Sequence, residues 1–377
     1  MDFLSSFTED SIPQWYRVLY SGIMLALCIF SFFYIKKVKL PLEEKRRRSI
    51  GFLVFFIFFS IGYCVNSDYF NYRNWVIWAS RWYDSDASVA LYQSLAYWCN
   101  GNYDLFRFVV WGGGLILVYI SSRKLHIDPF TTLLILFVFY CTYFCYARAS
   151  LAMAVYWFGV VFFVTTSSKS IIKKIIGIIL IFSSIIFHRE MIVPVLCLPF
   201  MFVSFSRKYA IAYIIVILVV IALAFVVFRD NIGVFGNFYL DKMAKYEEQM
   251  MYGEMMWQQR NWNGLLKTYI GYMLYLIPIA VISLKIFSTK NITSVSQSTI
   301  RIHRVALGIV ISALAIYIVY GGETVFFYRT LYTTQIPIAL LSTELFSQRN
   351  IGKRSLLLML FIAFIFNVMG FVSIING

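Results

Sequence analysis

Charged side chains are scarce in this chain, and their scarcity excludes most classes of soluble protein. Asp, Glu, Lys and Arg make up only 14% of the 377 residues, whereas 60% of the residues are hydrophobic. The mean hydropathy is +0.75. Because a soluble domain of this length cannot bury so much apolar surface, the composition predicts an integral membrane protein.

Residues that build metal and redox centres are also few. The chain has three histidines and six cysteines, with no Cys-x-x-Cys pair and no Cys/His spacing typical of zinc sites. We therefore expect neither a metal nor a cofactor. The first 14 residues contain no Lys or Arg. Since a cleavable signal peptide begins with a basic region, the first apolar run is predicted to stay in the membrane as an anchor.

Long apolar runs follow one another along the whole chain. A membrane-spanning helix needs about 20 apolar residues, and its backbone groups must be hydrogen-bonded within the segment, which favours helices over barrel strands here. The sequence therefore predicts an all-α, polytopic membrane protein, a single membrane domain over residues 1–377 with about twelve transmembrane helices. The expected spans are 16–35, 50–66, 105–122, 130–146, 149–166, 171–187, 191–206, 210–228, 264–284, 305–320, 327–346 and 355–374.

The basic residues indicate how these spans are oriented. The first link, Lys36–Arg48, carries seven basic residues, and the positive-inside rule places it in the cytoplasm. Alternation then puts five further basic links inside, near 123–124, 169–174, 207–208, 285–304 and 349–354. The inner links hold only four of the 18 acids, namely Glu43, Glu44, Asp128 and Glu344. The net charge of +15 therefore indicates topology and contact with the lipid surface, not binding of nucleic acid.

Most of the remaining ionisable residues fall on the predicted outer face. Its long loops, 66–104 and 229–263, are each expected to carry an interfacial helix, the first of them near Leu91–Trp98. Asp68 and Tyr72 would share a helix face, and Arg73 follows them. Tyrosines and carboxylates suit a site edge that binds a hydroxyl-rich ligand. The alternative is an interfacial aromatic belt with a capping aspartate.

Three arginines are predicted to lie near this outer surface: Arg148, Arg189 and Arg329. A guanidinium stays charged and binds phosphate oxygens in a bidentate manner, so we expect a polyprenyl-diphosphate sugar as ligand. His188 ends the sixth span and is suited to accept a proton near neutral pH, although a hydrogen-bonded helix cap is the alternative. Tyrosines flank two of the arginines and are expected to line the sugar-binding edge; they are Tyr146, Tyr328 and Tyr332.

In order and spacing, these motifs resemble the Wzy-type bacterial polysaccharide (O-antigen and exopolysaccharide) polymerases, in particular the EpsG family. The segments that carry the resemblance are Asn66–Tyr72, Tyr146–Ala152, Phe187–Arg189 and Tyr328–Tyr332, within about residues 50–346. The chain departs from the family pattern at Ser67, where the family often has glycine. It departs again at Arg189, where the family often has a small residue.

The resemblance implies a glycosyl transfer without nucleotide sugar on the outer face of the bacterial cytoplasmic membrane. A growing glycan would leave undecaprenyl diphosphate and join a hydroxyl of a new lipid-linked repeat unit. Arg148 and Arg329, with Arg189, would hold the diphosphate, and His188 or, as second choice, Asp68 would act as the base. The implied partners are the undecaprenyl-diphosphate-linked oligosaccharide, the lipid bilayer, and a chain-length regulator and flippase of the same pathway.

Two other classes fit parts of the sequence. A GT-C-like glycosyltransferase that uses a polyprenyl-monophosphate sugar would rely on an acidic loop such as Asp84 and Asp86, whose carboxylates can hold a divalent metal. A lipid-linked glycan flippase or transporter would place ionisable residues near the bilayer midplane and show related halves. The charges here gather at one predicted surface, and the chain shows no clear internal repeat.

Overall fold

The structure of this protein is a computed structural model. The described residues are 13–37, 42–61, 73, 76–77, 87–140, 147–167, 170–203, 215, 218–219, 223, 262–288, 296–320, 325–347, 362 and 365. Within these residues the chain is helical and holds no strand, which confirms the predicted all-α class.

The helices follow in this order: α1 (Gln14–Lys37), α2 (Leu42–Ile61), α4 (Ala87–Trp98), α5 (Tyr103–Arg107), the π-helical turn η4 (Phe108–Gly112), α6 (Gly113–Lys124), α7 (Pro129–Phe139), α8 (Ala147–Thr165), α9 (Ile171–Phe187), the 3₁₀ turn η6 (Arg189–Met191), α10 (Ile192–Leu196), the 3₁₀ helix η7 (Leu198–Phe202), α13 (Trp262–Ser288), α14 (Gln297–Tyr320), α15 (Val325–Tyr332) and α16 (Gln335–Ser347). Helix α4 confirms the short helix expected near Leu91–Trp98.

Side-chain caps explain where several helices begin. Asn102 accepts a hydrogen bond from the Leu105 amide at 3.0 Å at the start of α5. Asp128 accepts from the Phe130 amide at 3.3 Å ahead of α7. At the start of α14 the Ser296 hydroxyl accepts from the Thr299 amide at 3.1 Å, and the Glu344 carboxylate of α16 accepts from the Ser296 amide at 3.2 Å. That bond ties the end of α16 to the first turn of α14.

Apolar surface lies on the outside of the described helices. Two stretches, Tyr103–Lys124 and Gln297–Ile318, are long and apolar enough to cross a membrane, and Ala149–Thr165 and Gly271–Ile286 are shorter apolar helices. Helix α9 exposes many large apolar side chains: Ile171, Ile172, Ile175, Ile176, Ile178, Ile179, Phe182 and Ile186. A face of this kind needs lipid or protein to cover it, which agrees with a membrane protein. The number of spans stays a prediction, since 210–228 and 355–374 lie largely outside the described residues.

Two predicted spans are broken, contrary to expectation. The run 191–206 begins at the last residue of η6 and divides into α10 and η7, where Pro199 has no amide hydrogen to continue α10. The run 327–346 divides at Thr333, between α15 and α16. There the Thr333 hydroxyl donates to the Thr330 carbonyl oxygen at 2.7 Å, which offers the backbone an alternative to the regular helix.

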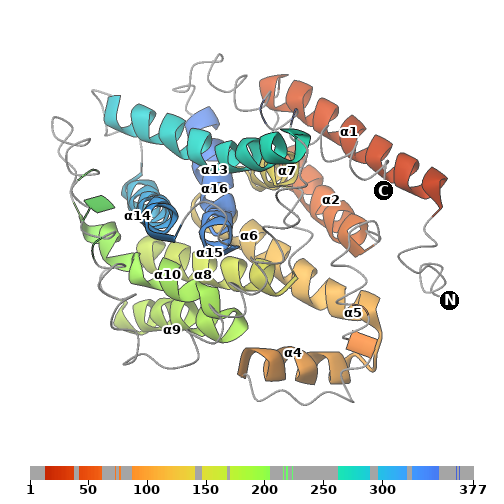
Figure 1. Cartoon of the computed structure of the whole chain (residues 1–377), viewed down its shortest axis with the longest axis horizontal. Helices are drawn as coiled ribbons and strands as arrows, with labels where there is room; N and C mark the ends of the chain where they lie inside the picture. The colour runs from red at the N-terminus through yellow and green to blue at the C-terminus, as the bar shows by residue number, and fades with distance from the viewer. Residues whose placement is uncertain are drawn as a thin grey trace.

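Helix α8 occupies the centre of the bundle. It packs against α9 on one side and against α14 and α16 on another, with α6 also in contact (Figure 1). The approach to α9 is closest at two glycines. A Cβ on Gly159 would lie 2.9 Å from the Ile181 amide nitrogen, and a Cβ on Gly177 would lie 3.2 Å from the Phe163 amide nitrogen. Facing glycines let two helix backbones pack closely, as is common in membranes.

We predict that Gly159→Ala destabilises the protein. The added methyl group meets backbone atoms of α9, so one helix must move, and overpacking of this kind costs about 1–3 kcal/mol. The measurement is the melting temperature of the protein in detergent. Gly51→Ala is the matched control, because a Cβ there meets nothing within 4 Å. Equal melting temperatures for the two variants would contradict the close packing of α8 on α9.

Candidate functional site

Two adjacent side chains of α8 hold the two broken segments in place. The Tyr156 hydroxyl donates to the Pro194 carbonyl oxygen of α10 at 2.6 Å. The Trp157 indole N–H donates to the Thr333 carbonyl oxygen, at the break between α15 and α16, also at 2.6 Å. Both side chains are fully buried. The Pro194 carbonyl also accepts from the Cys197 amide at 3.1 Å within its own segment. The two side-chain bonds therefore tie both segments to α8.

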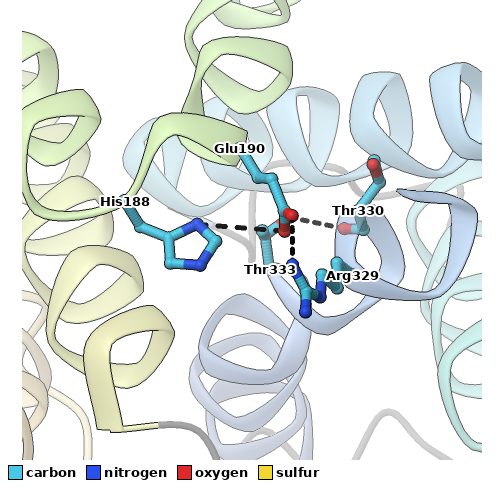
Figure 2. A network of polar contacts seen from close by, with 5 residues as sticks. All are labelled: His188, Glu190, Arg329, Thr330 and Thr333. Atoms are coloured by element: carbon cyan, nitrogen blue, oxygen red, sulfur yellow. Dashed lines mark hydrogen bonds and ion pairs between the residues drawn. The ribbon is translucent and has the colours of Figure 1, made fainter. Parts of the chain in front are cut away.

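The two segments meet at a carboxylate, Glu190 (Figure 2). Its Oε1 accepts a hydrogen bond from Arg329 Nη1 at 2.5 Å, across 139 positions of sequence. Its Oε2 lies 3.8 Å from His188 Nδ1. The exposed fractions of the side chains are 18% for His188, 15% for Glu190 and 32% for Arg329. All three are therefore partly open, which a ligand-binding group requires.

The backbone explains how His188 and Glu190 come to point the same way. His188 ends α9 in an extended conformation, with φ −155° and ψ 118°, and its amide donates to the Ser184 carbonyl oxygen at 3.0 Å. The 3₁₀ turn η6 then follows at once and packs against both α8 and α15. This turn carries Glu190 to the face where Arg329 of α15 lies.

The electrostatic arrangement is uneven. The guanidinium of Arg329 is in direct hydrogen-bonding contact with Glu190, whereas the His188 ring stands beyond hydrogen-bonding distance of the same carboxylate. In this structure Glu190 is therefore mainly the partner of Arg329. A guanidinium bound to a carboxylate presents the geometry with which it also binds phosphate oxygens.

Tyrosines cluster around α15. The ring centroids of Tyr328 and Tyr332 lie 4.0 Å apart. Two tyrosines of α13 pack against them: the Tyr272 ring centroid lies 5.6 Å from that of Tyr328, and the Tyr275 ring centroid lies 5.5 Å from that of Tyr332. Tyr332 is only 3% exposed, so its ring packs within the protein, while Tyr328 is half-buried. Of these two predicted sugar-edge residues, Tyr328 is the more open.

The other predicted site residues are placed less fully. Arg148 is the second residue of α8, and its side chain lies outside what the structure describes. Arg189 is half-buried in η6, and Arg73 is half-buried. Three further residues lie outside the described part of the chain: Asp68, Tyr72 and Tyr146. Their roles stay predictions.

The sequence reasoning did not select Glu190, although the residue stands two positions after His188. The signal that could have identified Glu190 is that an arginine on the outer face needs a counter-ion. It also passed over Arg107, which is 1% exposed and lies between the rings of Trp111, at 4.8 Å, and Tyr103, at 5.7 Å. These three residues recur every fourth position along one helical face, so the spacing was visible in the sequence.

No other candidate centre stands out among the described residues. They hold no group of three or more His, Cys, Asp or Glu side chains that could bind a metal ion. Asp84 and Asp86 lie outside the described residues. Cys99 is a buried free thiol, and burial raises its pKa, which disfavours the reactive thiolate.

Comparison with protein families gives one result for this chain. The model of the EpsG family matches residues 47–377. No curated protein and no solved structure matches the chain.

We predict that Trp157→Phe destabilises the protein by about 1–3 kcal/mol, because the buried Thr333 carbonyl loses its indole donor. The measurement is the melting temperature in detergent. Trp98→Phe is the matched control, since the Trp98 side chain is 68% exposed on α4. If both substitutions shift the melting temperature equally, the indole bond to Thr333 contributes nothing to holding the break.

Proposed function

The chain belongs to the EpsG family, and from this membership and the His188–Glu190–Arg329 arrangement we infer that it polymerises lipid-linked oligosaccharides. Membership of this family supports a role in polysaccharide biosynthesis in a membrane. The proposed substrate is an oligosaccharide repeat unit on a polyprenyl diphosphate, with undecaprenyl diphosphate as the carrier. The observation that supports a reaction centre is that Arg329, from a distant segment, bonds to Glu190 while His188 lies 3.8 Å from the same carboxylate.

The proposed reaction is a direct displacement at the anomeric carbon of the growing glycan. The acceptor hydroxyl oxygen, on a new lipid-linked unit, attacks this carbon and forms the new glycosidic bond. The bond from the carbon to the diphosphate oxygen breaks, and its electron pair stays on the diphosphate. The hydroxyl proton passes to a base of the protein. Because diphosphate is already a good leaving group, the protein needs no general acid for it.

Arginines carry the first role, stabilisation of the charge that develops on the departing diphosphate. A fixed guanidinium in a partly dehydrated site stabilises such charge more than water does. Arg329 is suited to this because its guanidinium is partly open, in the last turn of α15. Arg148, in the first turn of α8, is the second proposed cation, and Arg189 is the third.

A base carries the second role, acceptance of the hydroxyl proton. His188 is the first candidate, because its ring stands in the same partly open cluster as Arg329. Glu190 is near enough to stabilise the imidazolium that forms. Asp68 remains the second candidate. The expected product has an inverted anomeric configuration, and retention, observed by NMR of the polymer, would contradict direct displacement.

We propose that this cluster faces the outside of the bacterial cytoplasmic membrane in a chain of about twelve spans. Two ring contacts support the orientation: Lys124 stands over Phe162 at 4.3 Å, and Lys174 over Phe163 at 5.8 Å. These basic residues gather where α6 and α8 end and α9 begins, whereas His188 terminates α9. Over 17 residues α9 extends about 25 Å, close to the thickness of a bilayer core. If the basic end is cytoplasmic, the cluster is external.

Sidedness is tested by labelling single cysteines, placed in a variant without the six native ones. We expect a membrane-impermeant maleimide to label Tyr97→Cys in intact cells, because Tyr97 is 75% exposed on the predicted outer helix α4. Lys173→Cys, at the exposed start of α9, should react only after the membrane is permeabilised. The opposite pattern would overturn the proposed orientation.

Catalysis is tested with the protein reconstituted in liposomes containing lipid-linked repeat units. Arg148→Ala and Arg329→Ala should abolish the polymer ladder, because each removes a cation from the diphosphate. His188→Asn should lower the initial rate by about 10²–10⁴-fold, which is the usual contribution of a general base to the rate. The matched control is His126→Asn, at a turn with φ 59°, a conformation that asparagine tolerates.

Two outcomes would contradict the proposal. A ladder from Arg148→Ala equal to that of the wild type would remove Arg148 from the site. Loss of activity on metal chelation or in Asp86→Ala would instead favour the GT-C-like mechanism, since the proposed displacement needs no metal.

A further inference from the structure

Glu190 is bonded to Arg329, whose guanidinium the proposed function assigns to the diphosphate. Oε1 of Glu190 accepts a hydrogen bond from Arg329 Nη1 at 2.5 Å. Carboxylate and phosphate oxygens use the same guanidinium geometry, so Glu190 and a diphosphate compete for one position. The Glu190 carboxylate therefore weakens binding of the diphosphate to Arg329. A role for Glu190 besides neutralising the arginine would explain its position.

We propose that the substrate diphosphate displaces Glu190 from Arg329, and that the released carboxylate then positions His188 for proton abstraction. This inference rests on the proposed function and assigns Glu190 an exchange of partners within it. Glu190 is in this scheme a positioning residue, because it acts through His188 and touches neither the anomeric carbon nor the attacking hydroxyl.

The exchange is feasible because the ion pair is partly open. Arg329 is 32% exposed and Glu190 15% exposed, so an incoming ligand can reach the guanidinium. Exposed ion pairs contribute only about 1 kcal/mol or less, and Arg329 is the more open member of this pair. A diphosphate carries more negative charge than one carboxylate and can engage more than one arginine at once, so it is the stronger competitor.

The released carboxylate has a partner close by. Glu190 Oε2 already stands 3.8 Å from His188 Nδ1, and the two residues are joined through the single residue Arg189. A side-chain rotation of Glu190 is enough to close the remaining distance to a hydrogen bond. A carboxylate on Nδ1–H fixes the tautomer and orientation of an imidazole, leaves Nε2 as the proton acceptor, and stabilises the imidazolium that forms.

This arrangement makes donor binding precede deprotonation of the acceptor. Before the donor binds, the charge of Glu190 is compensated by Arg329 and is less available to His188. After the donor binds, Arg329 serves the diphosphate and Glu190 serves His188. The base is therefore fully assembled only when a glycan-loaded diphosphate is in place, so donor binding is coupled to deprotonation of the acceptor.

The test separates binding from turnover in the full-length protein. Farnesyl diphosphate, a short polyprenyl diphosphate, is titrated into detergent-solubilised protein by calorimetry, and initial rates are measured at saturating lipid-linked repeat unit. Glu190→Gln removes the competing charge, so its Kd for farnesyl diphosphate should fall about twofold to fivefold. Its kcat should fall at least about tenfold, because His188 loses the carboxylate.

Controls distinguish this pattern from damage to the fold. Glu44→Gln makes the same change of charge in the first turn of α2 and should leave both quantities unchanged. A misfolded variant loses binding and turnover together, whereas tighter binding with slower turnover is specific to the exchange. Glu190→Ala also removes the carboxylate and should show the same two directions, so it replaces Glu190→Gln if that variant does not fold.

The outcomes also separate this inference from the proposed function. If Arg329→Ala weakens farnesyl diphosphate binding but neither Glu190 variant tightens it, the exchange is overturned and the diphosphate site stands. If the Glu190 variants bind more tightly with unchanged kcat, the positioning of His188 is overturned. If Arg329→Ala binds farnesyl diphosphate as the wild type does, both the diphosphate site at Arg329 and the exchange are wrong.

Discussion

The candidate site depends on one constraint: backbone that leaves a helix inside an apolar protein must find hydrogen-bond partners there. Two neighbouring residues of α8 meet this need. Tyr156 pairs with the Pro194 carbonyl and Trp157 with the Thr333 carbonyl, so both interrupted segments are fastened to the same turn of one helix. These two bonds help to hold η6 beside α15, where Glu190 meets Arg329.

The packing of α8 on α9 positions His188. Facing glycines, Gly159 and Gly177, let the two helices approach until backbone atoms are nearly in contact. Because His188 is the residue that caps α9, this tight packing determines where its imidazole stands relative to α15. Breaks in helices are useful here: they turn the ends of rigid elements toward each other and leave a partly open cluster of charge between them.

The predictions from sequence succeeded where the signal was local. The runs 149–166 and 171–187 agree closely with α8 and α9, since a long apolar stretch has little choice but to be helical. The run 327–346 was expected as one helix and is broken at Thr333, because threonine hydroxyls that bond to carbonyls one turn back leave no strong mark on an apolar pattern. His188 and Arg329 were both selected as site residues, but nothing in the sequence indicated that they share a carboxylate.

By itself the sequence determined the helical class, the membrane environment and the types of residue at the site, because hydrophobic length, charge scarcity and side-chain chemistry are properties of the chain alone. The tertiary structure decided which of those residues meet. Glu190 contacts Arg329 across 139 positions, and that contact follows from where Tyr156 and Trp157 anchor two distant breaks. Hydrogen bonds between distant backbone carbonyls and side chains leave no periodic trace in a sequence, so their partners are chosen only when the helices pack.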